Sequence, residues 1–263
     1  MKFAIYCSPS VTQVHRLTQM ITSLGAEYAL EPEHLVGFDM IISYGGDGTF
    51  LSTSRRVVDS QLPILGVNGG RLGFLATTNF DVLETALTRI ISGDYQVEQR
   101  TMISIEGLEL PHSDALNEFT LQKRTPSMIY ITLIVDSLEV ATYWADGIIV
   151  STPTGSTAYS MSVGGAIIAP TCDCWIISPI APHNLNLRSL VISCDSVVEL
   201  RTQSRFGDTI TATIDNREFE VPSVNRFLLC RRENGLPVVL SPEQSFYETL
   251  KQKLYWGLDV RLD

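Results

Sequence analysis

The segment Gly45–Thr49, with the sequence Gly-Gly-Asp-Gly-Thr, places three glycines around one carboxylate at the end of the apolar run 41–44. A strand, a glycine-rich turn and a helix in this order present backbone N–H groups and a helix N-terminus to a phosphate. Glycine suits such a turn because a Cβ would block positive φ values and the close approach of an anion. A carboxylate is unfavourable inside an anion site unless it holds a metal or accepts a proton. The segment therefore predicts phosphate chemistry at Asp47, although taken alone it fits a capped tight turn equally well.

A second glycine-rich segment, Asn68–Leu75, follows the predicted strand 62–67. It is either an ordinary loop between a strand and a helix or a second wall of the same phosphate site. In the second interpretation Phe74 supplies an apolar or stacking surface. Arg71 then binds phosphate through the charged, planar fork of its guanidinium.

Two further polar groupings have the chemistry of a nucleotide site. Asn117 offers a paired donor and acceptor that match an adenine edge, and the Glu118 carboxylate accepts hydrogen bonds from ribose hydroxyls. Such a dipeptide by itself is more often a solvated strand end. The segment 151–160 is rich in Ser and Thr, as a linker would be, but it runs directly into the apolar segment 163–168. We therefore interpret it as part of a site for a polar ligand such as a dinucleotide.

Charge and composition limit the classes of partner. The chain has 263 residues, of which 44% are hydrophobic, with 19 Lys and Arg against 29 Asp and Glu, for a net charge of -10. This length suits one large domain or two modest ones. A negative surface disfavours binding to nucleic acids and to anionic membranes. Any anionic ligand must therefore be bound by a local positive site.

The five cysteines and four histidines do not form a metal-binding pattern, because no CxxC pair occurs and the two residue types are not clustered. We interpret the cysteines as reduced thiols. The first residues contain too short an apolar run for a secretion signal, and no segment approaches the ~18 apolar residues that span a bilayer. These features predict a soluble, cytoplasmic protein without a membrane partner.

The first ninety-odd residues alternate between predicted strands and helices. Strands are expected at 3–7, 40–44 and 62–67, and helices at 11–24, 50–58 and 82–91. This alternation indicates an α/β domain with an open, mostly parallel sheet, in which ligands bind at the carboxyl ends of the strands. The turn at Gly45–Thr49 lies at such an end.

From about residue 101 the pattern changes to short, closely spaced β-rich runs. They lie at 101–106, 118–122, 129–136, 139–143, 147–151, 189–192, 197–201, 209–214 and 227–230. Such runs predict a β-rich, sandwich-like domain. A last helix is expected at 246–256. The predicted domains are 1–98, a phosphate-donor domain on which the segment 240–263 packs back, and 99–239, which binds the dinucleotide.

The turn Gly45–Thr49 resembles the signature shared by NAD kinases, diacylglycerol and sphingosine lipid kinases, and phosphofructokinases. Over nearly the whole chain, the order of the other motifs is similar to that of the NAD kinases, and Thr152–Tyr159 is the most specific of them. These motifs are Asn68-x-Gly70-x-Leu72-Gly73-Phe74-Leu75, Asn117-Glu118, Asp146-Gly147, Thr152-Pro153-Thr154-Gly155-Ser156-Thr157-Ala158-Tyr159, Gly164-Gly165, Pro182-His183 and Lys253-Leu254-Tyr255-Trp256-Gly257.

This resemblance implies a bacterial-type ATP-NAD kinase that transfers the γ-phosphoryl group of ATP to the 2′-hydroxyl of the adenosine ribose of NAD. It also implies a need for Mg²⁺ and a homodimer or homotetramer, with Asp47 as the general base. The triphosphate would be bound by Gly45, Gly46, Gly48, Thr49 and Arg71. The NAD-binding residues would be Asp47, Gly48, Phe74, Asn117, Glu118, Asp146, Thr157, Ala158, Tyr159, Ser160, Met161 and Ser162.

The chain departs from the family pattern at three places. Trp144 stands where the family commonly has Arg, Val163 replaces an Ala, and Asp215-Asn216-Arg217 replaces Asp-Gly-Gln. The Trp removes a potential phosphate partner, which Arg217 would restore if the two residues were neighbours. Two alternative functions stay open: a lipid kinase with the same glycine-rich turn, and a non-catalytic sensor that binds NAD.

Overall fold

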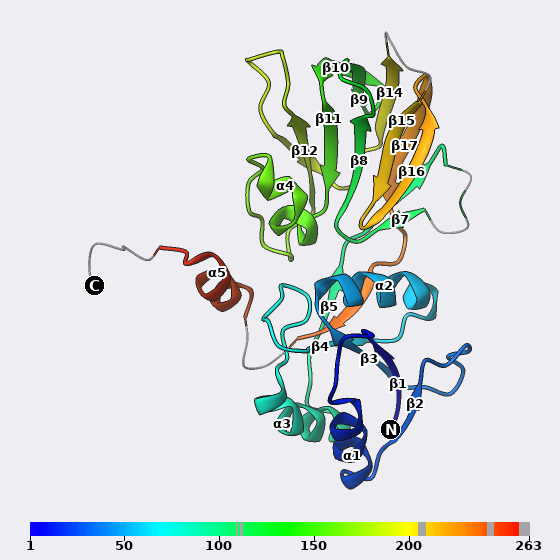
Figure 1. The fold of residues 1–263 in the computed structure, drawn as a ribbon, viewed down its shortest axis with the longest axis vertical. Helices are drawn as coiled ribbons and strands as arrows, with labels where there is room; N and C mark the ends of the chain where they lie inside the picture. The colour runs from blue at the N-terminus through cyan, green and yellow to red at the C-terminus, as the bar shows by residue number, and fades with distance from the viewer. Residues whose placement is uncertain (109, 111–112, 205–208, 241–244, 258–263) are drawn as a thin grey trace. The chain divides into compact units, whose positions relative to one another are not determined.

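The computed structural model describes residues 1–108, 110, 113–204, 209–240 and 245–257. They form two compact units: Met1–Gln99 together with the segment that begins at Leu236, and Arg100–Gly235. Figure 1 shows an α/β unit, blue to cyan with red and orange C-terminal elements, and a β-rich unit in green to orange. The predicted α/β region followed by a β-rich region is thereby confirmed. Within the part of the chain described, no helix is long and apolar enough to cross a membrane.

The first unit is built on a six-stranded sheet of order β2-β1-β3-β4-β18-β5, in which the neighbouring pairs from β2 to β18 are parallel. The strands are β1 (Lys2–Cys7), β2 (Glu27–Leu30), β3 (Met40–Gly45), β4 (Ile64–Asn68), β5 (Val97–Arg100) and β18 (Leu236–Val239). The helices are α1 (Val14–Ser23), α2 (Asp47–Val57), α3 (Phe80–Ile91) and α5 (Phe246–Leu254), with a 3₁₀ turn η1 (Val58–Ser60).

Local sequence explains these elements. The central strand β3 is buried along its whole length, as its apolar run predicts. Helix α3 begins where the Asn79 side chain accepts hydrogen bonds from the N–H groups of Asp81 and Val82, at 3.0 and 3.2 Å. Helix α2 starts at Asp47, three residues before the predicted start. An acidic first residue suits this helix because it faces the positive end of the helix dipole.

Three strands of this sheet were not predicted. Strand β2 carries mostly exposed side chains at an edge, so it lacks the apolar run that marks a strand. Strands β5 and β18 are four residues long each, and β18 arrives from a distant part of the sequence to pair with β4. Their pairing is a tertiary property, which local periodicity does not encode.

The second unit consists of two six-stranded sheets, with orders β10-β9-β14-β17-β6-β7 and β13-β12-β11-β8-β15-β16, in which all strand pairs are antiparallel. One apolar cluster draws residues from both sheets, and the rings of Phe119 and Phe227 meet across it at 5.3 Å. This is a sandwich, as predicted (Figure 1). The strands are β6 (Ile103–Glu106), β7 (Asp114–Ala115), β8 (Glu118–Lys123), β9 (Ile129–Val135), β10 (Leu138–Ala145), β11 (Gly147–Ser151), β12 (Cys174–Ile180), β13 (Leu190–Ser193), β14 (Val198–Ser204), β15 (Thr209–Ile214), β16 (Arg217–Pro222) and β17 (Asn225–Arg231).

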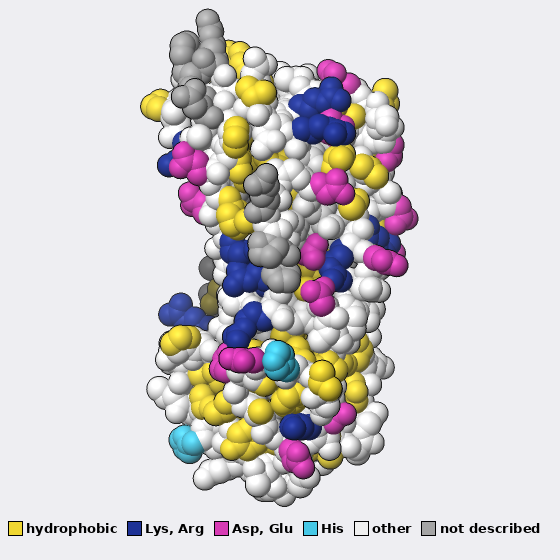
Figure 2. All heavy atoms as spheres, turned by 90° about the vertical axis from the view of Figure 1, so that its right-hand side faces the viewer, with side chains coloured by type: hydrophobic (Ala, Val, Ile, Leu, Met, Phe, Trp, Pro, Cys, Tyr) yellow, Lys and Arg dark blue, Asp and Glu magenta, His cyan; other side chains and the backbone are white. Residues whose placement is uncertain are grey.

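The Ser- and Thr-rich segment folds into a 3₁₀ turn η2 (Thr154–Thr157) followed by the short helix α4 (Tyr159–Ser162). It is therefore structured, in agreement with the interpretation that it is not a linker. Strands β7, β12 and β16 were not predicted. Figure 2 shows that acidic and basic side chains both occur on the face of the molecule that it draws.

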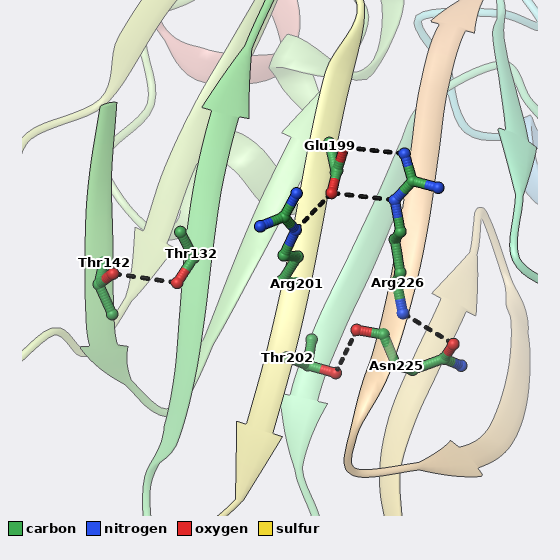
Figure 3. A network of polar contacts seen from close by, with 7 residues as sticks. All are labelled: Thr132, Thr142, Glu199, Arg201, Thr202, Asn225 and Arg226. Atoms are coloured by element: carbon green, nitrogen blue, oxygen red, sulfur yellow. Dashed lines mark hydrogen bonds and ion pairs between the residues drawn. The ribbon is translucent and has the colours of Figure 1, made fainter. Parts of the chain in front are cut away.

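One polar network lies on the β9–β10–β14–β17 sheet (Figure 3). The Glu199 carboxylate accepts from Arg201 Nε at 2.5 Å, and from Nε and Nη2 of Arg226 at 2.9 and 3.0 Å. The hydrogen bonds from the two guanidinium groups lower the pKa of Glu199 to about 2. Because both arginines form ion pairs with the Glu199 carboxylate, we interpret the network as a cross-strand contact of the sheet.

Candidate active site

The turn between β3 and α2 carries the first group of predicted site residues. Gly45 ends β3, Gly46 precedes the helix in an extended conformation, and Asp47 is the first helical residue. Glycine is required at position 45 because a Cβ there would overlap the side chain of Thr49. Among the described residues, no neighbouring side chain or strand approaches a Cβ built at Gly46 or Gly48 within 4 Å. Open space therefore lies beside a helix N-terminus, where free N–H groups favour an anion.

The Asp47 carboxylate joins this turn to the second glycine-rich segment. Its Oδ2 accepts the N–H of Phe74 at 2.9 Å, and its Oδ1 accepts the N–H groups of Leu75 and Ala76 at 3.0 Å each. Gly73 permits this approach, because a Cβ at that position would overlap the carboxylate. The structure thus brings together the two segments that were predicted to share a site.

Further contacts fix the second segment. The Gly69 N–H donates to the Gly45 carbonyl at 2.9 Å, and the Gly70 N–H donates to Asn68 Oδ1 at 3.3 Å. Arg71 is exposed in the same segment. The half-buried Phe74 meets the ring of Phe246 of α5 with centroids 6.1 Å apart.

The hydrogen bonds of Asp47 define what its carboxylate can do chemically. An ionised carboxylate has about four acceptor positions. Two N–H donors occupy Oδ1, whereas Oδ2 receives one N–H and lies 3.8 Å from Lys253 Nζ. Oδ2 is therefore the oxygen with room for a further hydrogen-bond donor.

In the second unit, the Asp215 carboxylate likewise accepts three backbone N–H groups, here from the segment that carries Asn117 and Glu118. Its Oδ1 accepts the N–H groups of Asn117 and Glu118 at 2.7 and 3.2 Å, and its Oδ2 accepts the N–H of Leu116 at 3.1 Å. Burial raises the pKa of Asp215, while these three N–H groups act in the opposite direction. A buried carboxylate thus fixes the backbone of two predicted NAD-binding residues.

Glu118 lies in an unusual environment for a carboxyl group. Burial, and secondarily the charge of Asp215, raise its pKa to about 8, although the backbone N–H of Tyr159 acts to lower it. Among the described residues, Glu118 Oε2, Thr120 Oγ1 and Ser160 Oγ are buried without a hydrogen-bond partner. Glu118 and Thr120 point to one face of β8 because strand residues two apart share a face. Unpartnered buried oxygens are uncommon in folded proteins, and a polar ligand at this place would give these three a partner.

The Ser- and Thr-rich segment forms hydrogen bonds with the backbone of residues 116 and 117. The Thr152 hydroxyl donates to the Leu116 carbonyl at 2.6 Å and accepts the N–H of Gly155 at 3.1 Å. The Thr152 N–H donates to the Asn117 carbonyl at 2.9 Å. A Cβ at Gly155 would overlap that carbonyl, so only glycine allows the turn to lie this close.

The remaining predicted residues lie near the other end of β8. Gln122 Nε2 donates to Tyr159 Oη at 2.7 Å, and Lys123 Nζ forms an ion pair of 2.6 Å with Asp146. The structure therefore brings Asn117, Glu118, Asp146 and Tyr159 to one strand and the segment packed on it. Thr157, Ala158 and Met161 are half-buried, Ser160 is buried and Ser162 is exposed.

Trp144 belongs to a separate aromatic group. Its ring stacks on Tyr130 with centroids 6.0 Å apart and an interplanar angle of 4°, and it meets His183 at 5.2 Å. Arg217 lies over the ring of Phe219, on an edge strand of the other sheet. The two residues therefore belong to different sheets, and Trp144 has Tyr130 and His183 as aromatic neighbours.

Sequence reasoning missed four residues of these groups: Lys123, Gln122, Asp215 and Lys253. Gln122 and Lys123 look like ordinary polar residues at a strand end. Asp215 was noted only as part of a motif that departs from the family pattern, and Lys253 only as part of a C-terminal motif. No local signal in the sequence reveals that they contact Tyr159, Asp146 or the other site residues.

The sequence and the fold both match known proteins. Residues 5–95 match the model of the ATP-NAD kinase N-terminal domain, and residues 116–239 match that of the ATP-NAD kinase C-terminal domain. The NAD kinase of Flavobacterium psychrophilum is 41% identical over 230 residues, which cover 85% of this chain and 78% of that protein. The NAD kinase of Porphyromonas gingivalis strain W83 is 42% identical over 232 residues, which cover 88% and 79%.

Two solved structures are similar in fold. The crystal structure of an NAD kinase from Archaeoglobus fulgidus in complex with ATP is 29% identical, with a TM-score of 0.83, and the match covers 97% of this chain and 99% of that one. Yeast NADH kinase complexed with NADH has a TM-score of 0.89 at 21% identity, covering 100% and 90%, and supports the fold alone. With both family models matched and relatives above 40% identity over most of its length, the chain belongs to the ATP-NAD kinase family.

Proposed function

We propose that this protein phosphorylates NAD with ATP, forming NADP. The observation that carries the proposal is the Asp47 carboxylate, fixed at the start of α2 beside open space and with room at Oδ2 for a further hydrogen-bond donor. The 2′-hydroxyl oxygen of the adenosine ribose attacks the γ-phosphorus, the bond to the bridging oxygen of ADP breaks, and the hydroxyl proton passes to Asp47. A base within hydrogen-bond reach accelerates such a step by roughly 10²–10⁴-fold.

In this proposal each unit binds ligand groups through its own residues. In the first unit, the N–H groups of the turn and Arg71 bind the triphosphate, and Phe74 provides an apolar wall. In the second unit, Asn117 and Glu118 bind the nucleoside, with Asp146 and the segment from Thr157 to Ser162. The support for the second assignment is the set of unpartnered buried oxygens at Glu118, Thr120 and Ser160.

Mg²⁺ accompanies ATP in this proposal. None of the described residues forms a group of three or more His, Cys, Asp or Glu able to hold a metal ion. Mg²⁺ commonly keeps several waters and is bound by substrate phosphates with only one or two carboxylates, so it would not need such a group. When bound, the ion neutralises charge on the phosphate oxygens.

The test is NADP formation from purified protein, NAD, ATP and Mg²⁺, read by an NADP-specific dehydrogenase. Asp47→Asn should lose most of its turnover. The amide of the new Asn would face one of the three backbone N–H groups with its own N–H donors, which could distort the turn. ATP and NAD binding must therefore be measured separately by calorimetry. Asp81→Asn is the matched control, since it changes an exposed acid in the first turn of α3. Loss of turnover with both substrates still bound supports the general base.

Other outcomes distinguish the alternatives. Binding of NAD without turnover by the unaltered protein would indicate a sensor, and phosphorylation of diacylglycerol or sphingosine would indicate a lipid kinase. Near-normal turnover of Asp47→Asn would refute the role of the carboxylate as base.

We also propose a homo-oligomer in the cytoplasm. Support for association comes from large apolar side chains exposed on the second unit, including Leu138, Trp144 and Leu185, at 70, 42 and 84%. All five cysteines are free, as is usual in a reducing compartment. Light scattering after size-exclusion chromatography tests the assembly, and a monomeric mass at micromolar concentration would refute it.

A further inference from the structure

Helix α5 is attached to the glycine-rich segment of the first unit through a small number of specific contacts. Ser245 and Glu248 form a capping box that fixes the start of the helix, with the Ser245 hydroxyl accepting the Glu248 N–H at 3.2 Å. The ring of Phe246 packs on Phe74, and Leu250 is buried one turn later. The helix is therefore placed against the segment that donates three N–H groups to Asp47.

This attachment determines where Lys253 lies. It follows Phe246 by seven residues, which is close to two helical turns, so both side chains lie on the same side of α5. The Lys253 ammonium is 4.9 Å from the centroid of the Phe74 ring and 3.8 Å from Asp47 Oδ2. Lys251 is also basic and belongs to the same helix, but it is exposed on another side.

The contact with Asp47 is not needed to stabilise that carboxylate. Three backbone N–H groups and the N-terminus of α2 already favour its charge. Lys253 and Asp47 each have about a third of their side chain exposed, at 32% and 31%, and an ion pair of this kind contributes little stability. The Lys253 ammonium can therefore leave the Asp47 carboxylate and bind a more highly charged anion with little loss of free energy.

In the proposed function, the triphosphate of ATP binds at this turn as a highly charged anion. ATP carries several negative charges, whereas the protein has a net charge of -10, so binding requires a local cation. Lysine is an effective phosphate ligand because its ammonium is a compact charge with three donors on a flexible stem. Arg71 is the basic residue of the glycine-rich segment itself, and Lys253 adds a second cation from α5.

We propose that Lys253 of the C-terminal helix binds the transferred phosphoryl group of ATP, leaving Asp47 Oδ2 available for the hydroxyl proton. This role rests on the proposed NAD kinase function and assigns to α5 a part in the phosphoryl-donor site. Lysine neutralises charge on the phosphate oxygens, and its departure from Oδ2 leaves that atom with a single N–H donor. Phosphate binding and proton acceptance are thereby coupled at one carboxylate.

The test compares steady-state kinetics of Lys253→Met, Lys253→Arg and Lys251→Met. Methionine keeps the apolar stem on Phe74 but removes the charge, and arginine restores the charge. We expect Lys253→Met to lower kcat/KM for ATP by about 10- to 100-fold, the range for losing a charged hydrogen bond. The KM for NAD should change by less than about twofold, Lys253→Arg should recover most of the activity, and Lys251→Met should match the unaltered protein.

Thermal unfolding of each variant shows whether a loss comes from the fold. Equal kcat/KM for ATP in Lys253→Met and Lys251→Met would overturn the proposal, as would parallel losses for ATP and NAD with a lowered Tm. If Lys253→Met does not fold, Lys253→Gln takes its place in the same comparison. An unaltered protein that forms no NADP would refute the proposed function itself, whereas an active protein that is indifferent to Lys253 would refute only this role.

Discussion

Replacing Glu118 by Gln should remove a pH dependence of stability that the buried carboxyl creates. Burial raises the pKa of Glu118 from 4.5 to about 8 in the folded protein. The folded state therefore holds this proton in a pH range where the unfolded chain has released it. By linkage, the free energy of unfolding falls as pH rises from about 4.5, and the loss is complete above about 8.

The magnitude follows from the same shift. At about 1.4 kcal/mol per pKa unit, a rise from 4.5 to about 8 corresponds to about 5 kcal/mol. Glu118 interacts with the buried Asp215, so part of this energy belongs to the pair. We expect the unaltered protein to lose about 2–5 kcal/mol relative to Glu118→Gln between pH 5 and 9. At pH 5 the two proteins should be similar, because a neutral carboxyl and an amide have nearly the same shape and charge.

Urea unfolding at several pH values from 5 to 9 measures this difference, with tryptophan fluorescence, to which the buried Trp175 of the second unit contributes, as the probe. Glu199→Gln is the control. Because the pKa of Glu199 is lowered to about 2, its contribution is present above pH 4.5 and lost only as pH falls towards 2. Glu199→Gln should therefore change the free energy of unfolding by the same amount at every pH from 5 to 9. Parallel curves for Glu118→Gln and the unaltered protein would refute the reasoning.

Two further substitutions test the hydrogen bonds by which Asp47 and Asp215 hold the backbone of the site. Gly73→Ala should disrupt the bonding of the Asp47 carboxylate, because the new methyl group would overlap it, and should lower stability by about 1–3 kcal/mol with loss of turnover. Gly46→Ala, where a Cβ meets open space, should unfold at nearly the same urea concentration as the unaltered protein, and an equal loss in both would contradict this account. Asp215→Asn should leave one backbone N–H facing an amide and cost about 1–3 kcal/mol. Kinetics should show a raised KM for NAD and little change for ATP, and an unchanged KM for NAD would refute the positioning role.

The architecture could be predicted because the first region has a clear local pattern. Apolar runs such as Met40–Gly45 mark strands that are buried on both faces, and the residues between them repeat at helical spacing. The short runs after residue 101 have strand character, and the apolar side chains of the two sheets meet in one core. Strands with a weak pattern, such as β2 and β16, were missed because their side chains are largely exposed at sheet edges.

The candidate site was predictable only in part. Glycines around Asp47 and the Thr152–Tyr159 segment stand out in the sequence because their composition is unusual. The contacts that fix them join distant positions: Asp47 with 74–76, and Asp215 with 116–118. Asp215 has no distinctive neighbours in the sequence. Long-range hydrogen bonds of this kind depend on the folded chain, so composition and spacing alone do not reveal them.

The position of β18 affects how the protein folds during synthesis. The first unit needs β18 between β4 and β5, but Leu236 leaves the ribosome well over a hundred residues after Arg100. Until then β4 lacks its outer neighbour, and the nascent sheet has an unpaired edge in its middle. The second unit is one continuous stretch of chain and is complete when residue 235 has emerged. Synthesis from the N-terminus therefore favours a vectorial order in which the inserted sandwich closes before the α/β sheet, leaving a chaperone-sensitive interval on the ribosome.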